Sequence, residues 1–168
     1  RRCNMKCEHC LRGEMQTLDI SLPLLRKIAQ TIHPNNVSFT GGEPSLNVNA
    51  IRKYFEYAER YGTMPLSFFV ATNGLSHREK LALALLEAYP KMGEKDMCEL
   101  AVSTDAFHAQ FWNEKYPESW GIFSGLSLTR NRRLTMPARM ISFGSFLRAV
   151  PNSILQIMDE LRPVFALH

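Results

Sequence analysis

The chain has 168 residues, of which 45% are hydrophobic and 21% are charged. These values are ordinary for a globular protein, and the length suits one domain with a sizeable core. The four cysteines are too few for a disulfide scaffold, and no apolar run approaches the roughly 18 residues of a membrane-spanning helix. We therefore expect a cytoplasmic protein in a reducing compartment, with no signal peptide and no membrane partner.

The net charge of +4 is unevenly distributed along the chain. Residues 121–168 carry a surplus of four positive charges, which equals the whole-chain value, so the part before them is neutral overall. A solvated basic face is the simpler interpretation, and a surface for an acidic substrate or nucleic acid is the alternative. The basic residues of this segment are Arg130, Arg132, Arg133, Arg139, Arg148 and Arg162.

A helix is the first regular element that the sequence predicts. It begins after Ser21, because an apolar stripe with helical spacing follows that residue. The residues of the stripe are Leu22, Leu25, Ile28 and Ile32. Pro34-Asn35-Asn36 ends the helix, and the short β-prone run Val37–Thr40 follows.

The same order of a helix followed by a strand is predicted next. A helix is predicted from Val48 to Ala58, with its apolar residues on one side and Gly62 as a C-cap. The run from Leu66 to Thr72 is typical of a buried strand, and Asn73-Gly74 ends it.

A third helix is predicted from Glu79 to Ala88, because Ser76 and Glu79 have capping-box spacing. A third strand follows over residues 99–103, and a helix over residues 106–115. Strand and helix thus alternate three times, which is typical of a parallel sheet covered by helices. One more strand is expected within residues 134–143 and one more helix within residues 152–161.

Three cysteines at the start of the chain have the spacing C-x3-C-x2-C: Cys3, Cys7 and Cys10. Three thiolates can converge on one inorganic centre, but they are too few to close a structural zinc site, which uses four protein ligands. Thiolates at short fixed spacings are also the usual ligands of iron–sulfur clusters. The spacing therefore predicts an iron–sulfur centre with one iron open to a small molecule.

Distinctive turns follow each of the three predicted strands. They are Gly41-Gly42-Glu43-Pro44, Asn73-Gly74 and Ser103-Thr104-Asp105. In parallel α/β folds, functional groups gather beyond the carboxyl ends of the strands, so we expect these turns to share one face. Paired glycines let the backbone approach a ligand, and a carboxylate on that turn suits a cationic amine.

The combination resembles the radical S-adenosylmethionine (SAM) enzyme superfamily. The motifs that carry the resemblance are Cys3-x3-Cys7-x2-Cys10, the run FTGGEP at residues 39–44, ATNG at 71–74 and VSTD at 102–105. The resemblance covers residues 1–108 and implies an α/β fold, a partial TIM-like (βα)6 barrel. We expect a single core domain over residues 1–168, with 1–120 matching well and 121–168 loosely.

The resemblance also implies the cofactors, a [4Fe–4S] cluster and SAM. The three cysteines would each ligate one iron and leave the fourth to the amino and carboxylate groups of SAM. The reduced cluster would cleave SAM to methionine and a 5′-deoxyadenosyl radical, which abstracts hydrogen from an unknown substrate. An external electron donor such as flavodoxin or ferredoxin is the further partner expected.

Individual SAM contacts follow from the same resemblance. His9 would lie near the adenine, and the Gly41-Gly42-Glu43-Pro44 turn would bind the methionyl ammonium, with Glu43 as a partner. Asn73 is also expected at the cofactor, while Ser103 and Asp105 would contact the ribose. The catalytic residues and the substrate are not indicated.

The barrel is expected to be incomplete in this chain, because only Arg1 and Arg2 precede Cys3, where the family has its first strand. Two alternatives to a radical SAM enzyme therefore stay open. One is a non-catalytic scaffold that binds SAM or a cluster. The other is a zinc-stabilised nucleic-acid-binding domain that uses His9 with the three cysteines.

Two further residues have two interpretations each. Cys98 precedes the third strand, so we expect it at the opposite end of the sheet from the cluster, as a structural or free thiol. His108 lies shortly after the third strand. It is either a solvated helix histidine or a residue that faces the site for substrate binding or proton transfer.

Overall fold

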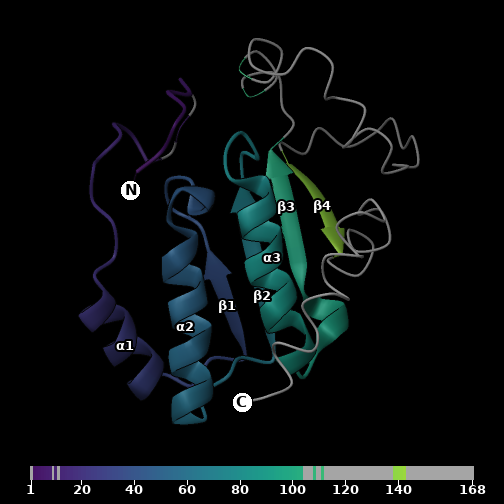
Figure 1. Cartoon of the computed structure of the whole chain (residues 1–168). Helices are drawn as coiled ribbons and strands as arrows, with labels where there is room; N and C mark the ends of the chain where they lie inside the picture. Colours follow the sequence, from purple (N-terminus) through teal and green to yellow (C-terminus); the bar gives the residue numbers. More distant parts are fainter. Residues whose placement is uncertain are drawn as a thin grey trace.

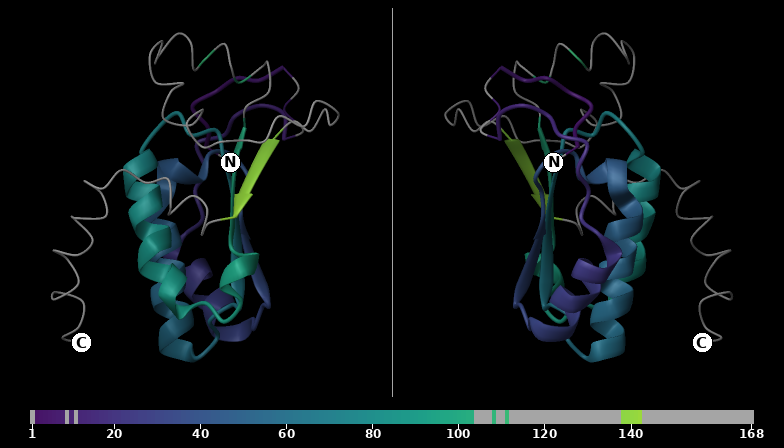
Figure 2. Two further views of the ribbon diagram at one scale, coloured as in Figure 1. Left: turned by 90° about the vertical axis from the view of Figure 1, so that its right-hand side faces the viewer. Right: turned by 90° about the vertical axis from the view of Figure 1, so that its left-hand side faces the viewer.

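The computed structural model describes residues 2–8, 10, 12–103, 108 and 111, together with the backbone of residues 138–142. These residues form a four-stranded sheet with helices on one face (Figure 1). Seen along the sheet, α2 and α3 cover that face, and α1 packs beside α2 on the same side (Figure 2). No helix of the described residues is long and apolar enough to cross a membrane.

The sheet has the strand order β1-β2-β3-β4. Strands β1 (Asn36–Phe39), β2 (Ser67–Thr72) and β3 (Glu99–Ser103) pair in parallel, with Val37 opposite Phe68 and Val70 opposite Leu100. This confirms the predicted parallel βαβ arrangement. The carboxyl ends of all three strands consequently lie at one edge of the molecule.

The fourth strand departs from a regular (βα)6 pattern. β4 (Ala138–Ser142) lies within the predicted strand region 134–143, but it runs antiparallel to β3, with Ala101 opposite Met140. A further βα unit would add a parallel strand, whereas β4 returns along the edge of β3 in the reverse direction. The helix predicted over residues 152–161 lies outside the described residues, as does most of the helix predicted over 106–115.

The helices begin and end near the predicted residues. α1 (Leu22–Thr31) is capped by Ser21, whose hydroxyl accepts a hydrogen bond from the Leu24 N–H at 3.4 Å. α2 (Val48–Tyr61) follows the short 3₁₀ helix η1 (Pro44–Asn47) and ends at Gly62, where φ is +68°. Glycine adopts this left-handed conformation without a Cβ penalty, so the predicted C-cap is confirmed.

The predicted capping box of the third helix is wrong. α3 (Arg78–Ala88) has His77 at its N-cap, in a left-handed conformation with φ +49°, and no side chain caps it. The Ser76 hydroxyl instead accepts a hydrogen bond from the Asn4 side-chain amide at 3.0 Å. Ser76 therefore connects the helix to the cysteine segment rather than closing the first turn of the helix.

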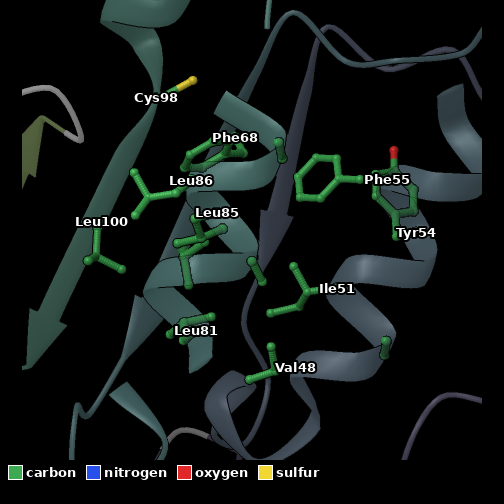
Figure 3. Packing of buried hydrophobic residues seen from close by; sticks show 14 of the residues in the cluster. Val48, Ile51, Tyr54, Phe55, Phe68, Leu81, Leu85, Leu86, Cys98 and Leu100 are labelled. Atoms are coloured by element: carbon green, nitrogen blue, oxygen red, sulfur yellow. The ribbon is translucent and has the colours of Figure 1, made fainter. Parts of the chain in front are cut away.

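The hydrophobic core lies between the sheet and helices α2 and α3 (Figure 3). Phe68 and Val70 of β2 and Leu85 of α3 are fully buried at its centre. The ring of Phe55 packs edge-on against Phe68, with 6.2 Å between the ring centroids. This packing holds the strands in fixed register and so fixes the positions of the turns that follow them.

Candidate cluster and cofactor site

The cysteine segment and the carboxyl ends of β1–β3 line one cavity of about 540 Å³ that opens to solvent. Figure 2 shows the N-terminal segment, in purple, crossing the end of the sheet toward which these strands point. Most of the predicted site residues line this cavity. They are Cys3, Cys7, Cys10, Gly41, Gly42, Glu43, Asn73 and Ser103.

The cysteine segment is shaped by two consecutive turns. The Cys10 N–H donates to the Cys7 carbonyl at 3.1 Å, and the Gly13 N–H donates to the Cys10 carbonyl at 3.0 Å. Gly13 has φ +66°, a value that side chains other than glycine rarely adopt. Met5 is only 3% exposed and belongs to the hydrophobic core, so the segment is anchored through its middle.

Arg2 ties the cysteine segment to the GGEP turn. Its carbonyl accepts a hydrogen bond from the Glu43 N–H at 2.8 Å. Its guanidinium donates to the Leu46 carbonyl at 2.5 Å and pairs with Asp19 at 3.1 Å. The thiols and the glycine turn are therefore held at a fixed separation by main-chain and side-chain contacts.

The Glu43 carboxylate joins the turns of two strands. The side chain is 4% exposed, and its Oε1 accepts hydrogen bonds from the Ser45 N–H at 3.0 Å and the Thr72 hydroxyl at 2.5 Å. Its Oε2 accepts from the Asn73 N–H at 2.7 Å. Such charge-assisted bonds are short and strong, and here they lock the turn after β1 to the turn after β2.

Asn73 joins the second turn to the cysteines. Its side-chain amide donates to Asn4 Oδ1 at 2.8 Å and lies 3.9 Å from Cys3 Sγ. Its Oδ1 accepts the Leu75 N–H at 3.0 Å, which makes an Asx turn. The cysteine segment thus contacts both strand-end turns.

The thiols lie in unlike surroundings. Burial raises the pKa of the Cys3 thiol, and the negative charges of Glu43 and Cys10 raise it further, although backbone N–H groups partly offset this. His108 Nε2 lies 3.7 Å from Cys7 Sγ and lines the cavity. His108 therefore faces the site, which agrees with the interpretation that it serves in substrate binding or proton transfer rather than as a solvated helix histidine. Cys10, in contrast to Cys3 and Cys7, is exposed.

The donor set fits a multi-iron cluster. No three described His, Cys, Asp or Glu side chains are close enough together to hold a single metal ion. A [4Fe–4S] cluster makes a different demand, because each thiolate binds its own iron and the three sulfurs need only surround one space. Cys3, Cys7 and Cys10 all line the same cavity. Five of the predicted cofactor residues line it with them: Gly41, Gly42, Glu43, Asn73 and Ser103.

Some predicted site residues lie elsewhere. His9 and Asp105 are outside the described residues, and Pro44 begins η1 without lining this cavity. Cys98 is fully buried at the amino end of β3, as predicted, far along the strand from the cysteine segment.

Several residues that build the site were not predicted from the sequence. Thr72 and Asn4 bind Glu43 and Asn73, and Arg2 and Met5 anchor the cysteine segment. Their positions within or beside the recognised motifs were the available signal, since Thr72 belongs to the ATNG run at residues 71–74 and Asn4 lies between Cys3 and Cys7.

Comparison with known protein families agrees with this geometry. The family model of the Radical SAM superfamily matches residues 1–110, which is more than half of the chain. The chain belongs to the radical SAM superfamily. Its parallel strands β1–β3 are consistent with part of the partial barrel of radical SAM proteins. Membership of the radical SAM superfamily implies a [4Fe–4S] cluster and SAM as cofactors, and the members of this superfamily are typically enzymes.

Curated relatives include proteins whose functions are not established. The uncharacterized protein MJ0907 of Methanocaldococcus jannaschii is 30% identical over 97 residues, which cover 55% of this chain and 34% of that protein. The putative protein YfkA of Bacillus subtilis is 34% identical over 70 residues, which cover 36% of this chain and 18% of that protein. The matches thus span only about a third and about a fifth of these relatives. No solved structure matches the chain.

Proposed function

We propose that this chain forms the cluster- and SAM-binding part of a radical SAM enzyme. The observation that supports the proposal best is the shared cavity, where the three cysteines meet the turns after three parallel strands. The hydrogen bonds of Glu43 and Asn73 connect these parts, so the cavity is a built site rather than a chance gap. The chemistry that a [4Fe–4S] cluster supplies when bound is the one-electron cleavage of SAM to methionine and a 5′-deoxyadenosyl radical, which abstracts hydrogen from substrate.

In this proposal the thiolates of Cys3, Cys7 and Cys10 would hold three irons of the cluster and would leave the remaining iron to the amino and carboxylate groups of SAM. The thiols must lose their protons when iron binds, since only the thiolate is a metal ligand. An electron donor such as flavodoxin or ferredoxin delivers the electron from outside. The substrate is left open.

The glycine turn binds the methionyl amino group, which keeps two N–H donors when its nitrogen is bound to iron. Gly41 has φ +127° and open space on its Cβ side, so the backbone can approach a ligand closely there. Glu43 contributes a carboxylate oxygen as well as holding the turn. Each carboxylate oxygen accepts two hydrogen bonds, and Oε2 has one donor among the described contacts, so it can accept a second from an N–H of the methionyl amino group.

The remaining SAM contacts are assigned to residues at the other strand ends. Ser103, at the end of β3, lines the cavity, and in this proposal its hydroxyl binds the ribose together with Asp105. Asn73 lies on the side of the cavity where the cysteines are, next to Cys3 and Asn4. His9 lies near the adenine in this proposal. The contacts of His9 and Asp105 rest on the resemblance alone, because both residues lie outside the described part of the chain.

The test is anaerobic reconstitution with iron and sulfide, followed by reduction in the presence of SAM. We expect a brown protein that forms 5′-deoxyadenosine. Cys7→Ser should abolish the product, whereas Cys98→Ser, at the far end of β3, should retain it. A wild-type protein that binds SAM and leaves it intact would instead support a non-catalytic scaffold. Stoichiometric zinc without iron or sulfide would favour the zinc-stabilised nucleic-acid-binding alternative.

A further inference from the structure

We propose that Asn73 raises the reduction potential of the cluster by donating a hydrogen bond to the sulfur of Cys3. This inference rests on the proposed function, because it requires the cluster. Asn73 is 5% exposed at the turn after β2, and its amide nitrogen lies 3.9 Å from Cys3 Sγ. Asn73 directly follows β2 and does not belong to the cysteine segment, so its position is set by the sheet.

The orientation of the Asn73 amide is fixed by its neighbours on both sides. Its Oδ1 accepts the Leu75 N–H, and a flipped amide would direct two donors at each other there. On the other side, Asn4 Oδ1 faces the Asn73 nitrogen while the Asn4 amide nitrogen donates to the Ser76 hydroxyl, which agrees with this orientation. The nitrogen of Asn73 must therefore be the atom that faces Cys3.

The amide has enough donors for both partners. A side-chain NH₂ group carries two hydrogens, so one can serve Asn4 Oδ1 at 2.8 Å and the other Cys3 Sγ. Because the Asn73 side chain is buried, water competes little for these hydrogens, and the hydrogen bond is electrostatically stronger than in water.

A donor at this sulfur affects the redox equilibrium in a definite direction. The reduced cluster carries one more negative charge than the oxidised cluster, so an N–H aimed at a ligating sulfur stabilises the reduced form more. Hydrogen bonds to the sulfurs are among the factors that set iron–sulfur potentials. Asn73 would thus offset the unfavourable effect of the neighbouring Glu43 carboxylate and make the cluster easier for an external donor to reduce.

The main test variant is Asn73→Ser. A serine hydroxyl can still accept the Leu75 N–H in an ST turn, so the backbone turn is retained, but the shorter side chain offers no donor near Cys3. A second variant, Asn73→Asp, keeps the shape and the Oδ1 acceptor and replaces only the NH₂ group. The matched control is Asn36→Ser at the opposite end of the sheet, where the Asn36 amide donates to the Ser67 hydroxyl at 2.8 Å.

The measurement is an anaerobic redox titration of the reconstituted proteins, followed by electron paramagnetic resonance (EPR) without SAM. Only variant samples whose iron and sulfide contents match those of the wild type are compared. We expect both Asn73 variants to disfavour reduction at least tenfold, a shift of about 59 mV to more negative potential for one electron. The Asn36 variant should titrate like the wild type.

Two results would overturn the inference. One is an unchanged potential in either Asn73 variant that carries a full cluster. The other is a shift in Asn73→Asp alone, which would assign the effect to the added charge and not to the lost donor. A wild-type protein that assembles no cluster refutes the proposed function. A wild-type cluster that cleaves SAM, with variant potentials unchanged, refutes only the role of Asn73.

Discussion

Replacing Glu43 with glutamine tests whether the buried carboxylate holds the site together. The two oxygens of Glu43 accept hydrogen bonds from two backbone N–H groups and the Thr72 hydroxyl. Glutamine has nearly the same shape, but only one of its two terminal atoms is an acceptor. Whichever way the amide turns, its NH₂ group faces the N–H of Ser45 or of Asn73, and that donor loses its partner.

The expected cost follows from this count. A buried donor without a partner costs about 1–3 kcal/mol, and changing the remaining bonds from charged to neutral costs roughly 1 kcal/mol more. Glutamine relieves the burial of a charge, but the three donors that surround Glu43 already compensate that charge. We therefore expect Glu43→Gln to lower the free energy of unfolding by about 2–4 kcal/mol.

The assay is urea denaturation of the cluster-free protein followed by far-ultraviolet circular dichroism. Glu87→Gln is the matched control, because Glu87 pairs with Arg52 at 3.0 Å while both side chains are about two-fifths exposed. Such exposed pairs contribute little, so the control should change stability by less than about 0.5 kcal/mol. If Glu43→Gln is as stable as the wild type, the carboxylate does not hold the two turns together.

Two further predictions concern the glycine turn and the buried thiol. Gly41→Ala and Gly62→Ala should each lower the free energy of unfolding by about 1–3 kcal/mol, because both positions have a positive φ that disfavours a Cβ. An added methyl group would meet no atom at either position, so this cost comes from the backbone conformation alone. Only Gly41→Ala should also weaken SAM binding in calorimetry, because Gly62 lies at the other end of α2, and equal affinities would contradict this. Burial raises the pKa of Cys98 in the folded state, so its stabilising effect is lost as pH rises above the ordinary thiol pKa of about 8.5. Wild-type stability should therefore fall more between pH 8 and pH 10 than that of Cys98→Ala, and parallel declines would count against this.

Local signals in the sequence were sufficient for much of the fold. Ser21 caps the start of α1 and Gly62 caps the end of α2. Both could be predicted because capping depends on the residue itself and its immediate neighbours. The shared cavity could be predicted because parallel strands must bring their carboxyl ends together. These features depend on short-range chemistry or on a topological rule.

Features that depend on distant partners could not be predicted. Ser76 has the spacing of a capping residue, yet it binds Asn4, which lies 72 positions away. The burial of Glu43 depends on how closely the turn after β2 approaches, and no local pattern reports that distance. The antiparallel direction of β4 likewise cannot be read from alternating strands and helices.

The most direct test of the account is the EPR spectrum of the reduced, reconstituted protein with and without SAM. The central claim is that Cys3, Cys7 and Cys10 hold a cluster whose open iron faces the SAM site on the strand-end turns. The account predicts a [4Fe–4S] signal that changes shape when SAM is added, and the loss of that change in Gly41→Ala. A cluster signal that SAM leaves unchanged would contradict it.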